Sequence, residues 1–222
     1  MYIQKEESEE MPLLDKPYLD MRISEDMMKH LWNCVNASTA KKVWPDMPDK
    51  ISKQAWLVDK DGLFFKTALR EPIRQLYYRN WNNYYDSITK TKPTPIFSLV
   101  EMWVNYQRQY DFNPPHNHIS APPTHPDTEN RLFSFVVFMQ IPTYYKEQHK
   151  LPNTLHGFRP HASDFLFIWP NKDDKLNLEY ITLNPEDEGR MLFFPSHLTH
   201  QVFPFYGTEK ERITISGNLI KN

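Results

Sequence analysis

The chain has 222 residues, of which 40% are hydrophobic and 24% charged, and its formal net charge at pH 7 is −2. This length suits one domain with a sizeable core, and the near-neutral charge excludes a general nucleic-acid-binding surface. No apolar stretch approaches the roughly 20 residues that cross a bilayer, and the one cysteine, Cys34, cannot form an internal disulfide, so we expect a cytoplasmic protein without membrane contact.

The N-terminal part, residues 1–95, is predicted to form an arm followed by helices that buttress the remainder. Residues 1–20 are polar and acidic, as is typical of an arm that packs little. Ser24 is placed to cap a helix in which hydrophobic residues recur at helical spacing as far as Val35. The same spacing predicts a second helix over residues 71–85.

After residue 95 the sequence changes to short β-prone segments separated by Pro, Asn, Asp or Gly. This density of strands predicts an antiparallel sandwich or distorted barrel of the jelly-roll type. We therefore expect a mainly β protein with N-terminal helices, in which residues 96–222 form the core and both parts make one integrated domain. The predicted strands cover residues 97–106, 132–141, 164–169, 178–183, 190–194, 201–205 and 211–219.

Two histidines one residue apart, His116 and His118, are the most distinctive chemical feature of the chain. Residues at i and i+2 of an extended segment project from the same face, so both imidazoles can reach one ion. The prolines just before His116 are expected to end β pairing there. Two histidines on an exposed segment could instead simply be solvated. A third imidazole, from His200, would favour a metal site.

Four segments together resemble the iron(II)/2-oxoglutarate-dependent oxygenases, and more narrowly their prolyl-hydroxylase-like branch and a subgroup frequent in bacteriophage and marine bacterial genomes. The segments are residues 106–118, the apolar strand that opens at Arg131, residues 189–202 and residues 212–216. The resemblance covers roughly residues 97–220. It implies a double-stranded β-helix core, a cupin-like jelly roll, and the use of iron(II), 2-oxoglutarate and dioxygen.

Carried over to this sequence, the resemblance makes His116 the first iron ligand and His200 the distal one. It makes Arg212, twelve residues after His200, the anchor for 2-oxoglutarate. A planar guanidinium is suited to this because it can grip a carboxylate through two hydrogen bonds. Thr214 lies on the same strand face and could add a hydrogen bond to that carboxylate, and Tyr106 could line the pocket.

The second ligand departs from the family pattern, in which Asp or Glu usually completes the metal site with two histidines. This chain has His118 at that position, so we take a three-histidine site as the leading interpretation. The rival is His125-Pro126-Asp127, which would supply a carboxylate from Asp127. Its proline-rich surroundings are typical of an exposed loop, whereas the distance from Tyr106 to His116 matches the family register.

Other polar residues have plainer interpretations. Arg212 could pair with an acid such as Glu209 in a surface bridge of little energetic weight. His197 is interpreted as a surface residue or as an outer partner of the site. His30, His149, His156 and His161 are interpreted as ordinary surface or loop residues.

The sequence thus predicts an iron(II)- and 2-oxoglutarate-dependent dioxygenase of a bacterial or phage-infected cell. It would hydroxylate an unidentified small molecule or protein and release succinate and carbon dioxide. One alternative is a non-catalytic jelly-roll protein with a binding or structural role, of a phage-associated kind. The other is a cupin-type metalloenzyme that does not use 2-oxoglutarate. The polar segment 143–150 could be a lid over the pocket or a long hairpin loop.

Overall fold

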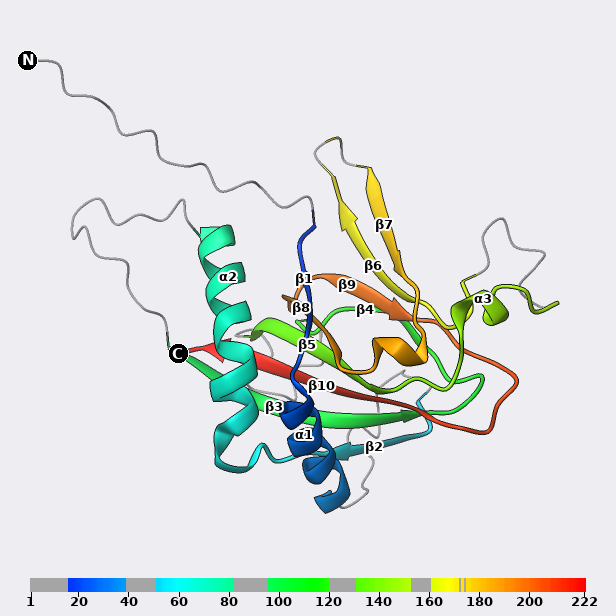
Figure 1. The fold of residues 1–222 in the computed structure, drawn as a ribbon. Helices are drawn as coiled ribbons and strands as arrows, with labels where there is room; N and C mark the ends of the chain where they lie inside the picture. Colours follow the sequence, from blue (N-terminus) through cyan, green and yellow to red (C-terminus); the bar gives the residue numbers. More distant parts are fainter. Residues whose placement is uncertain are drawn as a thin grey trace, which may run out of the picture.

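The computed structural model describes residues 16–38, 51–81, 96–119, 131–152, 161–171, 173 and 175–222. Within these residues, two antiparallel sheets pack together and the N-terminal helices cover the outer face of the larger sheet (Figure 1). The helices are α1 (Glu25–Ala37), a 3₁₀ turn (Lys60–Gly62), a π-helix (Phe65–Leu69), α2 (Arg70–Trp81), α3 (Tyr145–Gln148) and a second 3₁₀ turn (Pro185–Asp187). The strands are β1 (Leu19–Arg22), β2 (Lys53–Trp56), β3 (Phe97–Gln107), β4 (Asn113–His116), β5 (Arg131–Gln140), β6 (Phe165–Pro170), β7 (Leu176–Ile181), β8 (Arg190–Pro195), β9 (Thr199–Val202) and β10 (Arg212–Lys221).

The larger sheet has the strand order β1-β8-β5-β10-β3-β2, and the smaller sheet has the order β4-β9-β6-β7. From β3 to β10 the chain passes repeatedly between the sheets, because β3, β5, β8 and β10 belong to the larger one and β4, β6, β7 and β9 to the smaller. This connectivity is that of a double-stranded β-helix. It confirms the predicted fold class, a mainly β jelly roll with N-terminal helices.

The larger sheet separates two hydrophobic clusters. Alternate residues of a strand face opposite sides, so β5 and β8 contribute to both. The helix-side cluster includes Phe135 and Phe193 together with Leu31 of α1 and Leu76 of α2. The inter-sheet cluster fills the space between the two sheets. Complete burial of one Leu or Phe side chain stabilises the fold by about 1.5–3 kcal/mol. The inter-sheet cluster comprises Tyr18, Val136, Phe138, Ile141, Phe165, Phe167, Ile181, Leu183, Leu192, Phe194 and Leu198.

Both predicted helices are present in the described residues. Ser24 caps α1, as predicted, by accepting a hydrogen bond from the backbone N–H of Met27 at 3.3 Å. The second helical segment begins earlier than predicted, because Asp59 accepts hydrogen bonds at 2.9 Å from the backbone N–H groups of Phe64 and Phe65. Residues 82–85 of the second predicted helix lie outside the described residues.

Two short strands of the N-terminal part extend the larger sheet, and the sequence did not predict them. β1 pairs with β8, although its first residues were interpreted as part of an arm, and β2 pairs with β3. Each has four residues, too few to display a clear hydrophobic periodicity. Because they lie at the two edges of the sheet, they support the proposal that residues 1–95 and 96–222 form one integrated domain.

β4 runs through Pro114 and Pro115, so the prediction that these prolines end β pairing ahead of His116 is wrong. β4 is an edge strand of the smaller sheet, where a residue without a backbone N–H is tolerated. Its register with β9 shifts between Asn113 and His116, and the pairing sets His116 directly opposite His200.

The segment 143–150 contains the short helix α3. Gln148 of this helix donates from Nε2 to the carbonyl oxygen of Tyr206 at 2.9 Å and accepts from the backbone N–H of Tyr206 at 2.9 Å. Two hydrogen bonds therefore tie this segment to the connection between β9 and β10.

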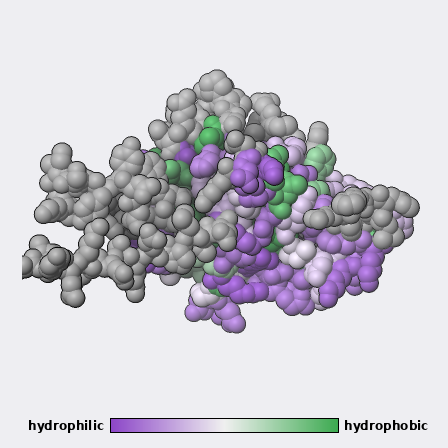
Figure 2. All heavy atoms as spheres, turned by 90° about the horizontal axis from the view of Figure 1, so that it is seen from above, coloured by the Kyte–Doolittle hydropathy of each residue, from purple (hydrophilic) through white to green (hydrophobic). Residues whose placement is uncertain are grey.

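The surface of the described residues is largely polar on the face drawn in Figure 2, where hydrophobic residues form small separate areas. The described part of the chain contains no helix with the length and apolar composition needed to span a bilayer.

Gly217 of β10 occupies a position with no room for a side chain. A Cβ atom there would lie 2.5 Å from the carbonyl oxygen of Glu101 and 2.6 Å from the ring of Phe135. We expect Gly217→Ala to lower the free energy of unfolding, measured with urea, by about 2–3 kcal/mol, as overpacking does. At Gly207, where no atom would lie within 4 Å of a Cβ and φ is +79°, alanine should lose only about 1 kcal/mol. Equal losses at the two positions would contradict the packing explanation.

Candidate metal centre

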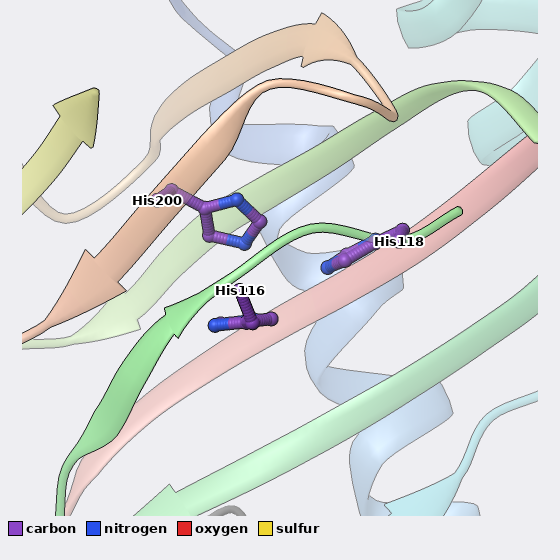
Figure 3. Close-up of side chains that lie close together, drawn as sticks. All are labelled: His116, His118 and His200. Atoms are coloured by element: carbon purple, nitrogen blue, oxygen red, sulfur yellow. The ribbon is translucent and has the colours of Figure 1, made fainter. Parts of the chain in front are cut away.

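Two histidines of one segment, His116 and His118, meet the distant His200 beside the inter-sheet cluster. Their ligand atoms all lie within 4.8 Å of one another, and Figure 3 shows the rings grouped around a common space. The ring centroids of His116 and His200 are 4.2 Å apart, and those of His118 and His200 are 5.0 Å apart. Among the described residues, no other group of three or more His, Cys, Asp or Glu side chains is placed to hold a metal ion.

The rings of His116 and His200 are each oriented by a hydrogen bond to a backbone carbonyl group two residues earlier in the chain. Nδ1 of His116 lies 2.8 Å from the carbonyl oxygen of Pro114, and Nδ1 of His200 lies 3.0 Å from that of Leu198. Because a carbonyl oxygen can only accept, each ring carries its proton on Nδ1 and leaves Nε2 free for a metal.

His118 is held by residues that are distant in sequence. Its ring Nδ1 lies 2.5 Å from Oδ1 of Asn218. Its backbone N–H donates to the carbonyl oxygen of Ser196 at 2.9 Å, and its own carbonyl oxygen accepts from Nη1 of Arg131 at 2.9 Å. The backbone and the ring of His118 are therefore both fixed from outside β4.

Burial keeps all three imidazoles uncharged at neutral pH. Loss of contact with water lowers the pKa of His116, and the same cause, with repulsion from His116, lowers the pKa of His118 to about 3. The pKa of His200 is also well below its usual value because of burial. Neutral imidazole is the form that binds a metal, and three such donors fit a divalent transition-metal ion such as iron(II).

The lowered pKa values predict that the metal-free protein loses stability in acid. Below the unfolded-state pKa of 6.5 the unfolded chain binds more protons than the folded one, so the free energy of unfolding falls as the pH drops towards the folded-state pKa, about 3 for His118. Each imidazole contributes up to about 1.4 kcal/mol per pH unit in this window. Burial raises the pKa of Asp164 from 3.8 to about 6, so between these pH values this carboxyl group makes the folded protein more stable as the pH falls. This single group opposes the three histidines, whose combined effect is larger.

Urea denaturation of the chelator-treated protein near pH 7 and near pH 5 would measure this effect. A metal-free protein that gains stability on acidification would contradict it.

Arg212 is fully buried at the start of β10. Its Nη2 donates to the carbonyl oxygen of Ser163 at 2.8 Å and to the Ser163 hydroxyl at 2.5 Å. Its Nη1 lies 3.5 Å from Oε1 of Gln107, and its Nε has no hydrogen-bond partner. The surface bridge to Glu209 is therefore wrong, because Arg212 turns into the protein. A buried guanidinium with an unpartnered Nε fits a site for a carboxylate ligand.

The charge of Arg212 is retained inside the protein. Burial lowers the pKa of its guanidinium to about 10, and the nearby carboxylate of Asp164 opposes that change. Asp164 lies 2.9 Å from Nε2 of His149 and 3.4 Å from Nδ1 of His161. Arg212 therefore stays cationic at neutral pH.

A stripe of polar side chains on β3 and β10 runs from Arg212 towards the histidines. Asn105 donates from Nδ2 to the Thr214 hydroxyl at 3.2 Å and accepts from Nε1 of Trp103 at 3.2 Å. The ring of Trp103 is 5.9 Å from that of His118. Thr214 lies on the face of β10 that Arg212 also occupies, which is the arrangement expected from strand alternation.

The structure does not bring Tyr106 to this group. Tyr106 pairs in register with Ile213 and packs against the helix-side cluster, with Nζ of Lys53 4.2 Å from its ring centroid. Its neighbours Asn105 and Gln107 face the interior instead, because alternate residues of a strand point to opposite sides. Tyr106 therefore lies on the opposite side of the larger sheet from the histidines and Arg212.

Several residues that support the site were missed by sequence reasoning. His149 and His161 are not ordinary surface residues, because they bond to the buried carboxylate of Asp164. Ser163, which accepts hydrogen bonds from Arg212, has a positive φ of 73°. Nothing in the sequence predicts this backbone conformation for a serine. Asn218 was likewise overlooked, since a lone Asn in an apolar strand suggests no partner.

The remaining histidines leave the three-histidine group as the metal-site candidate. His197 is exposed. The rival motif His125-Pro126-Asp127 lies outside the described residues, as does His156. No carboxylate from the described residues joins the three imidazoles.

Comparisons with known proteins agree with this geometry. The family model described as "Putative 2OG-Fe(II) oxygenase" matches residues 101–218, more than half of the chain. This range contains the three histidines and Arg212. No curated protein matches the sequence.

Solved structures with a similar fold include three 2-oxoglutarate oxygenases. One is an oxidoreductase of the 2OG-Fe(II) oxygenase family from Burkholderia pseudomallei, with 10% identity, 94% of this chain and 86% of that chain covered, and a TM-score of 0.55. A prolyl hydroxylase from Trichoplax adhaerens, in complex with a peptide fragment of hypoxia inducible factor, has 13% identity, 94% and 85% coverage and a TM-score of 0.53. A prolyl-4-hydroxylase from Pseudomonas putida has 14% identity, 95% coverage of both chains and a TM-score of 0.50. These likenesses establish the fold, and the match of the family model over more than half of the sequence shows that the chain belongs to the 2OG-Fe(II) oxygenase family.

Proposed function

We propose that this protein is an iron(II)- and 2-oxoglutarate-dependent dioxygenase that hydroxylates a substrate and releases succinate and carbon dioxide. Membership of the family implies iron(II), 2-oxoglutarate and dioxygen. The observation that carries the proposal is the pairing of an uncharged, largely buried three-histidine group, in which His200 is buried and His116 and His118 are partly exposed, with a buried arginine whose Nε has no partner.

In this proposal His116, His118 and His200 bind iron(II) through their free Nε2 atoms. With only three protein ligands, iron(II) would still be able to bind 2-oxoglutarate and dioxygen. Neutral imidazoles leave both positive charges of iron(II) uncompensated, so the dianionic 2-oxoglutarate supplies the charge that a carboxylate ligand would otherwise provide. When bound, iron(II) couples the oxidative decarboxylation of 2-oxoglutarate to the activation of dioxygen.

Arg212 binds the far carboxylate of 2-oxoglutarate in this proposal, and Thr214 adds a hydrogen bond. Ser163 orients the guanidinium through its carbonyl and hydroxyl oxygens. The ring of Phe205, with its centroid 5.2 Å from Cζ of Arg212, shields the ion pair from water. Attachment at both ends fixes the cosubstrate in one orientation. Its rotational freedom is therefore lost on binding and not during the reaction step.

The reaction that we propose is hydroxylation, as in the prolyl-hydroxylase-like branch, with a protein or small molecule as substrate. We place it in the cytoplasm of a bacterial or phage-infected cell, because a chain with one cysteine needs no oxidising compartment.

Anaerobic titration tests the proposal. Adding iron(II) and then 2-oxoglutarate should produce the weak visible charge-transfer band of the chelate, and admitting air should yield succinate. Pyruvate is the matched control, because it has the same 2-oxo acid but lacks the carboxylate that Arg212 would bind. A cupin-type enzyme would show no response to 2-oxoglutarate. A non-catalytic protein would show neither stoichiometric iron nor succinate, and either result would overturn the proposal.

A further inference from the structure

His118 differs from the other two histidines in how its ring is held. His116 and His200 each bond through Nδ1 to the carbonyl oxygen two residues earlier in the chain, so their orientation is local. His118 lies just beyond the end of β4 and bonds to a side chain one hundred residues away, Asn218 of β10. The orientation of this ring therefore depends on Asn218.

An amide side chain can present either its oxygen or its NH₂ group, so Asn218 needs a partner that decides between them. That partner is Glu101, because Nδ2 of Asn218 lies 2.5 Å from Oε2 of Glu101 and a carboxylate can only accept. Oδ1 of Asn218 consequently faces His118, and it also accepts from the Ser134 hydroxyl at 2.8 Å. An oxygen in this position obliges His118 to donate from Nδ1, which leaves Nε2 free.

Glu101 is in turn fixed by a buried ion pair. Its Oε1 lies 2.5 Å from Nη2 of Arg131, and only 5% of the Arg131 side chain and 11% of the Glu101 side chain are exposed. The same guanidinium donates from Nη1 to the carbonyl oxygen of His118 at 2.9 Å. Glu101 and Arg131 thus hold His118 from two sides, one through Asn218 and the other through the backbone.

We propose that Asn218, oriented by Glu101, is the positioning residue that makes His118 a metal ligand at the place where the family usually has a carboxylate. This inference rests on the metal site of the proposed function. The three-histidine group itself contains no carboxylate, but the carboxylate of Glu101 contacts it indirectly, through the Asn218 amide. Its negative charge polarises that amide. Hydrogen bonding of this kind raises the basicity of a ligating imidazole and fixes its tautomer.

Two variants test the proposal. Asn218→Ala removes the acceptor, and Glu101→Gln replaces the carboxylate with an amide that can donate as well as accept, so the orientation of Asn218 is no longer specified. In ¹⁵N NMR spectra of the metal-free protein, both should change His118 from a single Nδ1–H tautomer to a mixture, while His116 and His200 keep theirs. Titration with cobalt(II) should show affinity reduced about 10- to 100-fold.

Asn222→Ala is the matched control, because Asn222 directly follows β10, is exposed, and donates from Nδ2 to the Ser98 hydroxyl at 2.9 Å. It should leave tautomers and cobalt(II) affinity unchanged. If a folded Asn218→Ala protein keeps one His118 tautomer and wild-type cobalt(II) affinity, the inference is wrong.

Failure of the proposed function would look different from failure of this inference. A wild-type protein that binds cobalt(II) but forms no succinate would count against the oxygenase and not against Asn218. The tautomer of His118 is read without any metal, so it reports on Asn218 even if Asn218→Ala binds no cobalt(II). Should Asn218→Ala fail to fold, Glu101→Gln carries the same test.

Discussion

Replacing His200 with alanine should abolish stoichiometric iron(II) binding and, with it, succinate formation. His200 is almost completely buried and lies opposite His116 across the β4–β9 pair, so no other described imidazole can take its place. Loss of an outer hydrogen bond costs a metal site about 10- to 100-fold in affinity, and we expect loss of a ligand to exceed that range. Anaerobic iron(II) titration followed by colorimetric detection of bound iron would measure the change.

The matched control is His197→Ala, because His197 is an exposed residue three positions earlier, in the turn before β9. This variant removes an imidazole from the turn just before the strand that carries His200, and it should keep wild-type iron binding. Wild-type affinity in His200→Ala, or equal losses in both variants, would show that the three histidines do not form the metal site.

Arg212→Met should strongly weaken binding of 2-oxoglutarate while leaving iron(II) binding intact. Methionine fills much of the buried volume but cannot bind a carboxylate. Truncating one partner of a buried, hydrogen-bonded charge pair costs about 2–5 kcal/mol, which corresponds to a Kd for 2-oxoglutarate raised roughly 30-fold to several thousand-fold. The charge-transfer band of the anaerobic chelate, followed against 2-oxoglutarate concentration, would give this Kd.

Arg108→Met is the control, since Arg108 is an exposed arginine whose Nε lies 3.3 Å from Glu211 at the surface. It should bind 2-oxoglutarate as the wild type does. Loss of iron(II) together with 2-oxoglutarate in Arg212→Met would point to a damaged fold, which thermal unfolding would reveal. Unchanged 2-oxoglutarate affinity in a folded Arg212→Met protein would exclude Arg212 as the anchor.

The parts of the fold that were predictable are those with a long sequence pattern. α1 and α2 show helical spacing over three or more turns, and strands such as β5 are unbroken apolar runs, so their cores were placed correctly. β1 and β2 have four residues each, and their strand conformation comes from pairing with distant partners. β4 escaped detection because an edge position, which only the three-dimensional arrangement defines, is what tolerates its prolines.

The residues of the site likewise fall into those that the sequence predicts and those that only the fold reveals. His116, His118 and Arg212 could be chosen because i, i+2 spacing and a family pattern are written along the chain. The residues behind them could not, because Asn218, Glu101 and Arg131 meet only when β10, β3 and β5 lie side by side. Tyr106 was misplaced because the face of β3 that turns inward depends on register, and a shift of one residue reverses it.

The two ends of the proposed pocket belong to different sheets, with His116 and His200 on the smaller one and Arg212 on the larger. Their separation is set by the aromatic layer between the sheets, in which the rings of Phe167 and Phe194 lie 5.0 Å apart. Such a layer is close-packed and yields little to a ligand. In the proposed site this layer would act as a spacer between the metal ligands and Arg212, so we expect the phenylalanines between the sheets to contribute to the choice of a diacid of one chain length.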